Sequence, residues 1–377
     1  MFYYYRMHVV LLAHIYSMAA VAHKNIFRSK FKGCLLGALF GDAFGAEFEC
    51  KYFQEPVPSE EFDRFSNEKL REMKTNKLFH FTDDSAMTMA ICRSLLRKKA
   101  FDIDHLANEF VRSFMAEPRR GYGGGVITVF DKLRSQTLED VKAPARDQFN
   151  GTGSYGNGAA MRVAPFALFY QNDVKEVKKA AREQALITHA HTLGVEGAVL
   201  QAVAVYLSLH TPLGKLDTSA YIDKLISVAK DLENKSKIDD DICHVDDEEA
   251  TQSFTTQLRH VKQLLVEHED DSNRQRVIDT LGHGIRAAEA VPTAIYAFLH
   301  KSKTCMKDAL FYSMSLGGDT DTIASMTGAI AGAYWGDEHI PQLWLDVTEG
   351  AQEMCEYSDE IYNIAFEANH PQNVVDK

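Results

Sequence analysis

The chain has 377 residues, with 53 acidic and 41 basic side chains and a formal net charge of −12 at pH 7. This length can bury a full hydrophobic core without disulfides, and the negative charge argues against a protein that binds DNA or RNA by neutralising phosphates. With 23 glycines and 9 prolines, the composition also excludes collagen-like and low-complexity disordered chains.

The first segment of the chain is basic and apolar. Residues 1–41 contain no Asp or Glu, and the apolar run Met7–Ala22 is interrupted by His8 and His14. The run is shorter than the ~20 residues that span a bilayer. A mitochondrial presequence fits this composition better than a secretory signal. We favour a loosely ordered N-terminal extension over residues 1–30, either disordered or targeting.

Apolar residues recur every three or four positions in seven later segments, and this spacing predicts helices. Pro292 fits the first position of a helix, where the missing N–H costs little. The only short β-branched run is Val126–Phe130, which could equally belong to a helix. The sequence therefore predicts an all-α fold with helices at Phe31–Phe48, Ser85–Lys99, Val174–His189, Leu193–Leu209, Thr255–His268, Pro292–His300 and Thr322–Trp335.

Glycines recur every four residues in the first of these helices. Glycine is unfavourable inside a helix by about 0.5–1 kcal/mol relative to alanine, so four of them indicate that another helix approaches closely. Small-residue faces also occur in membrane dimers, but Asp42 and the short apolar lengths favour a soluble core. We expect Gly33, Gly37, Gly41 and Gly45 to pack against Ala324, Gly328, Ala331 and Gly332.

Two acidic segments, residues 239–249 and 267–271, interrupt the helical pattern and are typical of solvated linkers. Motifs that carry chemistry lie on both sides of them, which favours a single domain over residues 31–368 followed by a tail at 369–377. The six cysteines show no metal or disulfide spacing. We expect reduced thiols at Cys34, Cys50, Cys92, Cys243, Cys305 and Cys355.

Two acidic motifs each open a predicted helix. Thr82, Asp83 and Asp84 are explained by helix capping alone, but Gly317–Thr322 has more alternating acids and hydroxyls than a cap needs. As a pair, the motifs predict a metal site, since carboxylate and Thr oxygens are ligands for hard cations. Oxygen-only ligands favour Mg²⁺ or Mn²⁺ over zinc. Two cations would offset the mutual repulsion of the carboxylates.

The segment Gly151–Gly158 contains a literal G-x-G-x-x-G. No β-branched strand precedes it, which argues against a dinucleotide-binding βαβ unit. Consecutive glycine N–H groups can still form a nest for a pyrophosphate, with Phe149 and Tyr155 as stacking faces for a base. The alternative is a plain flexible loop. A second glycine cluster, Tyr122–Gly125, is a candidate wall of the same groove.

Two further candidates stand alone in the sequence. Glu49 ends a predicted helix and is either an acid or ligand of the site or a surface residue. His189 and His191 lie near a helix end, where a structural hydrogen bond is the simpler interpretation.

Together these motifs resemble the ADP-ribosylglycohydrolase family. The shared stretches run from about Phe31 to about Trp335 and are GCLLGALFGDAFGAEFE, FTDDSAM, GSYGNGAAMRVAPFALF, ITHAHTLG, VPTAIYAFL and SLGGDTDTIASMTGAIAGAYWG. GDAFGAEFE and GSYGNGAAMRV point to the branch that acts on serine-linked ADP-ribose and poly(ADP-ribose). The resemblance implies an orthogonal helical bundle whose binuclear metal cleft holds two Mg²⁺ ions, with Mn²⁺ as a substitute.

Carried over residue by residue, the resemblance implies a full set of site residues. Catalytic roles fall on Glu49, Asp83, Asp84 and Asp321. Metal ligands are implied at Glu49, Thr82, Asp83, Asp84, Asp319, Asp321 and Thr322. Substrate contacts are implied at Gly123, Phe149, Gly153, Ser154, Tyr155, Gly156, Asn157, Gly158, His189 and Ile285, with Phe149 and Tyr155 on either side of the adenine.

The implied activity is Mg²⁺-dependent hydrolysis of the O-glycosidic bond between ADP-ribose and serine, and of poly(ADP-ribose) and O-acetyl-ADP-ribose. We expect these molecules and ADP-ribosylated proteins as partners, no sequence-specific nucleic acid, no membrane and a monomer. The resemblance implies the nucleus and cytoplasm, and also the mitochondrial matrix. Two alternatives stay open: an arginine-ADP-ribose hydrolase, and a noncatalytic ADP-ribose-binding or crystallin-like protein, against which the complete set of carboxylates argues.

Overall fold

Every regular element in the described part of the chain is helical, as the three- and four-residue spacing predicts. The computed structural model describes residues 2–49, 51–72, 78–135, 139–236, 241–243, 253–267 and 274–367. Its α-helices are α1 (Phe2–Glu49), α2 (Ser59–Arg64), α3 (Leu70–Glu72), α4 (Asp83–Lys98), α5 (Ile103–Ala116), α6 (Gly124–Ser135), α7 (Ala143–Arg146), α8 (Ala164–Phe169), α9 (Val174–Ala185), α10 (Thr192–His210), α11 (Thr218–Ser236), α12 (Phe254–Glu267), α13 (Arg274–Leu281), α14 (Ala287–His300), α15 (Met306–Ser315), α16 (Thr320–Trp335), α17 (Gln342–Val347) and α18 (Ala351–Glu367). A π-helix at Phe65–Lys69 and 3₁₀ turns at Gln148–Gly151 and Asn157–Ala159 complete them.

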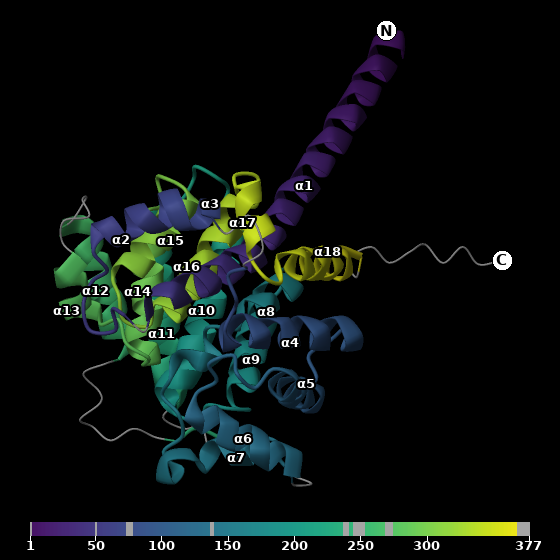
Figure 1. Cartoon of the computed structure of the whole chain (residues 1–377). Helices are drawn as coiled ribbons and strands as arrows, with labels where there is room; N and C mark the ends of the chain where they lie inside the picture. Colours follow the sequence, from purple (N-terminus) through teal and green to yellow (C-terminus); the bar gives the residue numbers. More distant parts are fainter. Residues whose placement is uncertain are drawn as a thin grey trace.

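The second half of α1 and the whole of α16 lie side by side and antiparallel (Figure 1). A Cβ added to Gly41 would lie 2.1 Å from the Ala324 carbonyl oxygen, and one added to Gly37 would lie 2.2 Å from that of Gly328. The two backbones therefore touch, which confirms the close approach predicted from the glycine spacing. Because the helices are antiparallel, the end of α1 lies beside the start of α16.

The first half of α1 projects from the helical body (Figure 1). Residues 2–30 are one continuous helix with the core part of α1, so the predicted boundary at residue 30 falls inside a helix. Arg28 forms an ion pair of 2.7 Å with Asp359. The Lys30 ammonium is buried and donates to the carbonyl of Leu209 at the end of α10 (2.9 Å).

The largest hydrophobic cluster among the described residues extends from Phe31 on α1 to Ala365 on α18, and a small second cluster contains Leu186 and Val195. Within the described residues, α10 is the one helix long and apolar enough to cross a bilayer, and 83% of its most apolar window is buried inside the protein. The five cysteines that the structure describes are free, which confirms the reduced thiols predicted there. The predicted acidic segments fall largely, and the tail at 369–377 entirely, outside the described residues.

Two predicted helix ends are wrong. Pro292 lies inside α14, which begins at Ala287. Proline has no N–H for the carbonyl four residues earlier, and the buried apolar run on both sides keeps the helix intact by packing. α9 ends at Ala185 rather than His189, because the N–H groups of Thr188 and His189 both turn back onto the Ala185 carbonyl (3.0 and 2.7 Å).

The contact between α1 and α16 can be tested with alanine at Gly41. The added Cβ meets backbone atoms that cannot rotate away, so we expect Gly41→Ala to lower the free energy of unfolding by about 1–3 kcal/mol or more. Gly124→Ala is the matched control, since a Cβ there meets nothing within 4 Å. Thermal or denaturant unfolding measures both, and equal stabilities would contradict the close contact.

Candidate active site

Most of the predicted site residues line one cavity of about 480 Å³. Of the predicted residues, Gly153 and Tyr155 are not in its wall. The wall also contains residues that sequence reasoning did not select, among them Arg162 and Thr188. The full lining is Glu49, Thr82, Asp83, Asp84, Met87, Gly121, Gly123, Gly124, Gly125, Val126, Gln148, Phe149, Ser154, Gly156, Asn157, Gly158, Met161, Arg162, Thr188, His189, Ile285, Asp319, Asp321 and Thr322.

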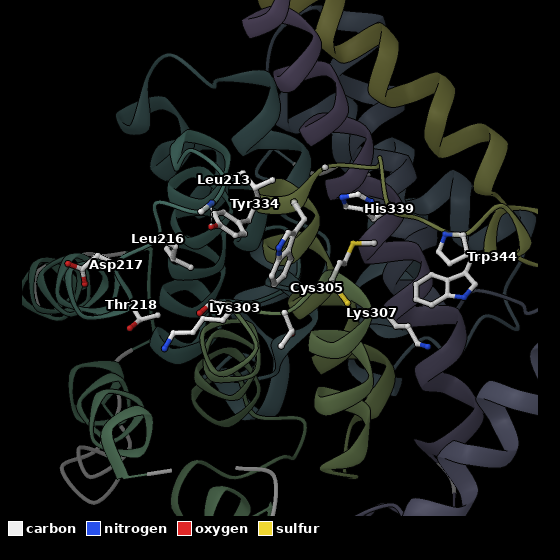
Figure 2. A pocket seen from close by; sticks show the side chains of 17 residues that line it. Leu213, Leu216, Asp217, Thr218, Lys303, Cys305, Lys307, Tyr334, His339 and Trp344 are labelled. Atoms are coloured by element: carbon white, nitrogen blue, oxygen red, sulfur yellow. Dashed lines mark hydrogen bonds between the residues drawn. The ribbon is translucent and has the colours of Figure 1, made fainter. Parts of the chain in front are cut away.

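A larger cavity of about 750 Å³ lies at the opposite end of α16 (Figure 2). Tyr334, Trp335 and Trp344 line it, and among the described residues of its wall Asp217 is the only carboxylate. The smaller cavity is the candidate active site, because the carboxylates of Glu49, Asp319 and Asp321 converge there.

The start of α4 is held by Asp42, a fully buried residue of α1. Its carboxylate accepts hydrogen bonds from the N–H groups of Thr82 (2.9 Å) and Ser85 (2.9 Å). Thr82 is the N-cap of α4 and accepts from the Asp84 N–H (3.3 Å), so the predicted cap is confirmed. Sequence reasoning missed Asp42, although an acid inside an apolar, glycine-rich helix is the signal for such a role.

The start of α16 depends on two glycines in the left-handed region. Gly317 has φ of 70° and Gly318 has φ of 75°. A Cβ on Gly318 would lie 2.0 Å from the His283 carbonyl oxygen, which accepts from the Asp319 N–H (2.8 Å). The Thr320 hydroxyl donates to the Gly45 carbonyl near the end of α1 (2.8 Å). These contacts turn Asp319 and Asp321 towards Glu49.

Three carboxylates converge at this point. Glu49, Asp319 and Asp321 each offer an oxygen, and the three atoms lie within 4.8 Å of one another. Asp84 lies beside them: the Thr322 hydroxyl donates to its Oδ2 (3.3 Å), while its buried Oδ1 has no hydrogen-bond partner among the described residues. A buried carboxylate oxygen without a donor fits a ligand that supplies positive charge. The oxygen-only set suits a hard cation.

Burial makes the charged forms of these acids unfavourable. Burial, followed by the charge of Asp42, raises the pKa of Asp83 to about 7. The same causes raise the pKa of Asp84 well above its usual value, and burial with the nearby charge of Asp319 does so for Asp321. A divalent cation among these groups would favour the ionised forms and lower the pKa values again.

The glycine loop, Gly151–Gly158, is hydrogen-bonded directly to one of the carboxylates. The Asn157 amide donates to Oδ2 of Asp319 (2.6 Å), and both side chains are buried. The Asn157 N–H donates to the Ile285 carbonyl (2.9 Å), and the Ala287 N–H donates to the Tyr155 carbonyl (3.0 Å). Asn157 was predicted as a substrate contact. In the structure its amide faces Asp319.

Phe149 and Tyr155 occupy different surroundings. Phe149 lies in the cavity wall, is 60% exposed, and approaches Gly125, whose added Cβ would lie 3.3 Å from the ring. Tyr155 is outside the wall, with the Arg286 guanidinium 4.8 Å from its ring centroid. The predicted stacking of adenine between the two rings stays a prediction.

The two histidines also differ. His191 is the N-cap of α10 and accepts from the Leu193 N–H (3.1 Å), which is the structural hydrogen bond that the sequence favours. His189 lines the cavity, and its Nδ1 lies 2.7 Å from the Thr188 hydroxyl. Burial, followed by the charge of Arg162, lowers the pKa of His189 to about 3, so the ring is neutral near pH 7.

The all-α fold and the acidic cleft beside the glycine loop can now be compared with known protein families. The family model of the ADP-ribosylglycohydrolases matches residues 23–371, and the chain belongs to this family. It is therefore an enzyme that hydrolyses glycosyl bonds. A solved structure described as an ADP-ribosylglycohydrolase-related protein complex has a TM-score of 0.61, is 20% identical, and covers 90% of this chain and 99% of its own, which supports the fold.

Within this family, the chain is similar to several proteins named ADP-ribosylhydrolase ARH3. ADP-ribosylhydrolase ARH3 of Mus musculus is 41% identical over 356 residues, covering 90% of this chain and 93% of the mouse protein. The proteins of the same name from Bos taurus and Homo sapiens are 42% and 41% identical, and each alignment covers 86% of this chain and 90% of the relative.

Removing one buried charge should show whether the carboxylates repel one another. The pKa of Asp83 in the folded protein, about 7, exceeds the ordinary value of about 3.9. Stability from the bound proton is therefore lost as pH rises through about 7. With a chelator at pH ~8, Asp83→Asn should unfold at a higher temperature than wild type. With excess Mg²⁺ the order should reverse.

Asp104→Asn is the control for this measurement, since Asp104 is an exposed acid on α5. It should change the unfolding temperature little in either condition. A lower unfolding temperature for Asp83→Asn in chelator would show that the carboxylates do not destabilise the free cleft.

The bond from Asn157 to Asp319 gives a second prediction. Asn157→Ala removes the donor that orients this carboxylate, and loss of such a partner typically weakens cation binding roughly 10–100-fold. Titration calorimetry with Mg²⁺ and Mn²⁺ measures the effect. Wild-type affinity in the variant would show that Asp319 needs no orientation by the loop.

Proposed function

We propose that the chain hydrolyses the O-glycosidic bond that joins ADP-ribose to serine in proteins, and also acts on poly(ADP-ribose) and O-acetyl-ADP-ribose. The observation that carries this proposal is the convergence of Glu49, Asp319 and Asp321 in one cavity with the glycine loop. The similarity to proteins named ADP-ribosylhydrolase supports the ADP-ribosyl part of the substrate. The serine linkage rests on the motifs GDAFGAEFE and GSYGNGAAMRV.

We assign the two ends of the cavity to two parts of the substrate. Ser154, Gly156 and Gly158 line one part of the wall, where the Ser154 hydroxyl, which accepts from the Gly156 N–H (3.2 Å), can donate to a diphosphate oxygen. The carboxylates line the other part, where the distal ribose would lie. An acidic protein binds an anionic ligand through such local dipoles and bound cations rather than through its overall field.

We propose that the cleft holds two divalent cations, Mg²⁺ with Mn²⁺ as a substitute, which the converging carboxylates support. Glu49, Asp83, Asp84, Asp319, Asp321 and the hydroxyls of Thr82 and Thr322 would hold them. Bound cations would orient the hydroxyls of the distal ribose and offset the negative charge of the carboxylates.

The side chains of the cleft then move protons at both ends of the reacting bond. Glu49 would leave the cations when the substrate enters. Away from them, burial raises the pKa of Glu49, which favours a protonated acid that donates to the departing serine oxygen. The bond between the anomeric carbon and that oxygen breaks through an oxocarbenium-like transition state. Water forms the new bond to the anomeric carbon, and an aspartate of the cleft, Asp83, Asp84 or Asp321, takes its proton.

We further propose a monomer located in the nucleus and cytoplasm, and also in the mitochondrial matrix. These statements rest on the resemblance alone. Light scattering of the purified chain and imaging of the tagged full-length chain test them directly.

Matched peptides separate the proposed activity from its alternatives. We expect release of ADP-ribose from a serine-linked peptide with Mg²⁺, little release from the arginine-linked peptide, and none in excess chelator. Asp83→Asn and Asp321→Asn should each lower the rate about 100-fold or more, whereas exposed Asp104→Asn should keep it. Release from the arginine-linked peptide alone would contradict the proposed serine linkage and support an arginine-ADP-ribose hydrolase. Binding without release from either peptide would indicate a noncatalytic protein.

A further inference from the structure

A buried arginine belongs to the cavity wall and has several defined partners. Arg162 has no exposed surface. Its Nε donates to Oε1 of Gln184 (2.8 Å), and its guanidinium lies over the Phe110 ring, 4.5 Å from the centroid. The Gln184 amide group donates to the Ala159 carbonyl (2.9 Å), so Oε1 is the end of this side chain that accepts. Nη1 of Arg162 also donates to Sδ of Met87 (3.5 Å) and Nη2 to the Gln184 carbonyl (3.2 Å), so these contacts fix the orientation of the guanidinium.

One donor of Arg162 is directed to the residue beside His189. Nη2 of Arg162 lies 2.7 Å from the hydroxyl oxygen of Thr188, and both residues are buried. A guanidinium only donates. The Thr188 oxygen is therefore the acceptor of this bond.

The Thr188 hydroxyl has a second neighbour, Nδ1 of His189, at 2.7 Å. If Nδ1 carried a proton, the Thr188 oxygen would accept from both sides, and its own proton would need a third partner. The Thr188 hydroxyl has no third partner within the described residues. A Thr188 proton directed at Nδ1 of His189 satisfies both atoms, with Nδ1 as the acceptor. A neutral imidazole whose Nδ1 accepts carries its proton on Nε2.

Nε2 of His189 faces the glycine loop at the cavity. A Cβ added to Gly158 would lie 3.3 Å from Nε2, and one added to Gly156 would lie 3.5 Å from it. In the part of the chain that the structure describes, this nitrogen makes no hydrogen bond. The ring is neutral near pH 7 because burial and the Arg162 charge disfavour a second proton.

We infer that Arg162 and Thr188 are positioning residues that hold neutral His189 with its proton on Nε2, so that the ring donates a hydrogen bond into the cavity. Such a donor selects a ligand with an acceptor oxygen at that point, such as a phosphate or ribose oxygen. It also means that His189 neither takes a proton from the ligand nor binds a cation through Nε2. The identity of the ligand as ADP-ribose rests on the proposed function, whereas the position of the proton does not.

Nitrogen NMR of the full chain labelled with ¹⁵N-histidine reads the proton position directly. The His189 signals are those that disappear in His189→Gln. We expect Nδ1 at the shift of an unprotonated nitrogen and Nε2 at the shift of a protonated one, near neutral pH. A protonated Nδ1 in the wild-type chain would overturn the inference, whatever the variants do.

Substitutions at Thr188 then test the positioning. Thr188→Val keeps the shape but removes the hydroxyl, so the His189 shifts should move towards those of mixed tautomers, and ADP-ribose should bind roughly tenfold more weakly. Thr188→Ser keeps a hydroxyl and should restore both. Thr192→Val is the matched control, since the Thr192 hydroxyl donates to the Cys243 carbonyl, away from Arg162 and His189.

The outcomes distinguish this inference from the proposed function. Unchanged His189 shifts in a folded Thr188→Val chain would overturn it. Should that variant not fold, the wild-type and Thr188→Ser spectra decide alone, since both must have Nε2 protonated. A wild-type chain with the expected shifts that does not bind ADP-ribose in calorimetry would refute the proposed ligand and support the position of the proton.

Discussion

Direct backbone contact between α1 and α16 is the constraint on which the site depends. Without Cβ atoms at Gly37 and Gly41, the two helices approach until carbonyl oxygens of α16 lie where those atoms would be. The antiparallel arrangement then places the end of α1, with Glu49, against the start of α16, with Asp319 and Asp321. Two stretches about 270 residues apart in the chain thus form one cluster of acids, because contacts along a rigid helix pair also fix where the ends of the two helices lie.

The same arrangement concentrates negative charge in a place that water reaches poorly. The burial of the Asp42 carboxylate is partly compensated, because it accepts hydrogen bonds from two backbone N–H groups at the start of α4. Asp84 has an oxygen that no donor among the described residues reaches. The buried carboxylates therefore lower the stability of the folded protein. Such unfavourable charge clusters are typical of sites that bind a charged ligand.

The sequence predicted the architecture well where one local rule decided the outcome. Glycines every four residues predicted the contact between α1 and α16, and Thr82 before two acids predicted a capped helix start. It failed at Pro292, where packing of the surrounding apolar residues outweighs a missing hydrogen bond. It also missed Asp42, Arg162 and Thr188, because their roles come from partners brought together only in three dimensions. The predicted adenine stacking and metal number depend on ligands, and stay predictions.

The bond between Asn157 and Asp319 joins the two halves of the cleft. Asn157 lies on the loop assigned to the diphosphate, and Asp319 belongs to the group assigned to cations. A change that shifts this loop will also rotate a cation ligand, so ligand preference and cation affinity cannot be altered independently by substitutions there. Attempts to redesign the enzyme for a bulkier nucleotide should therefore keep this asparagine and modify the part of the wall near Phe149 and Gly125.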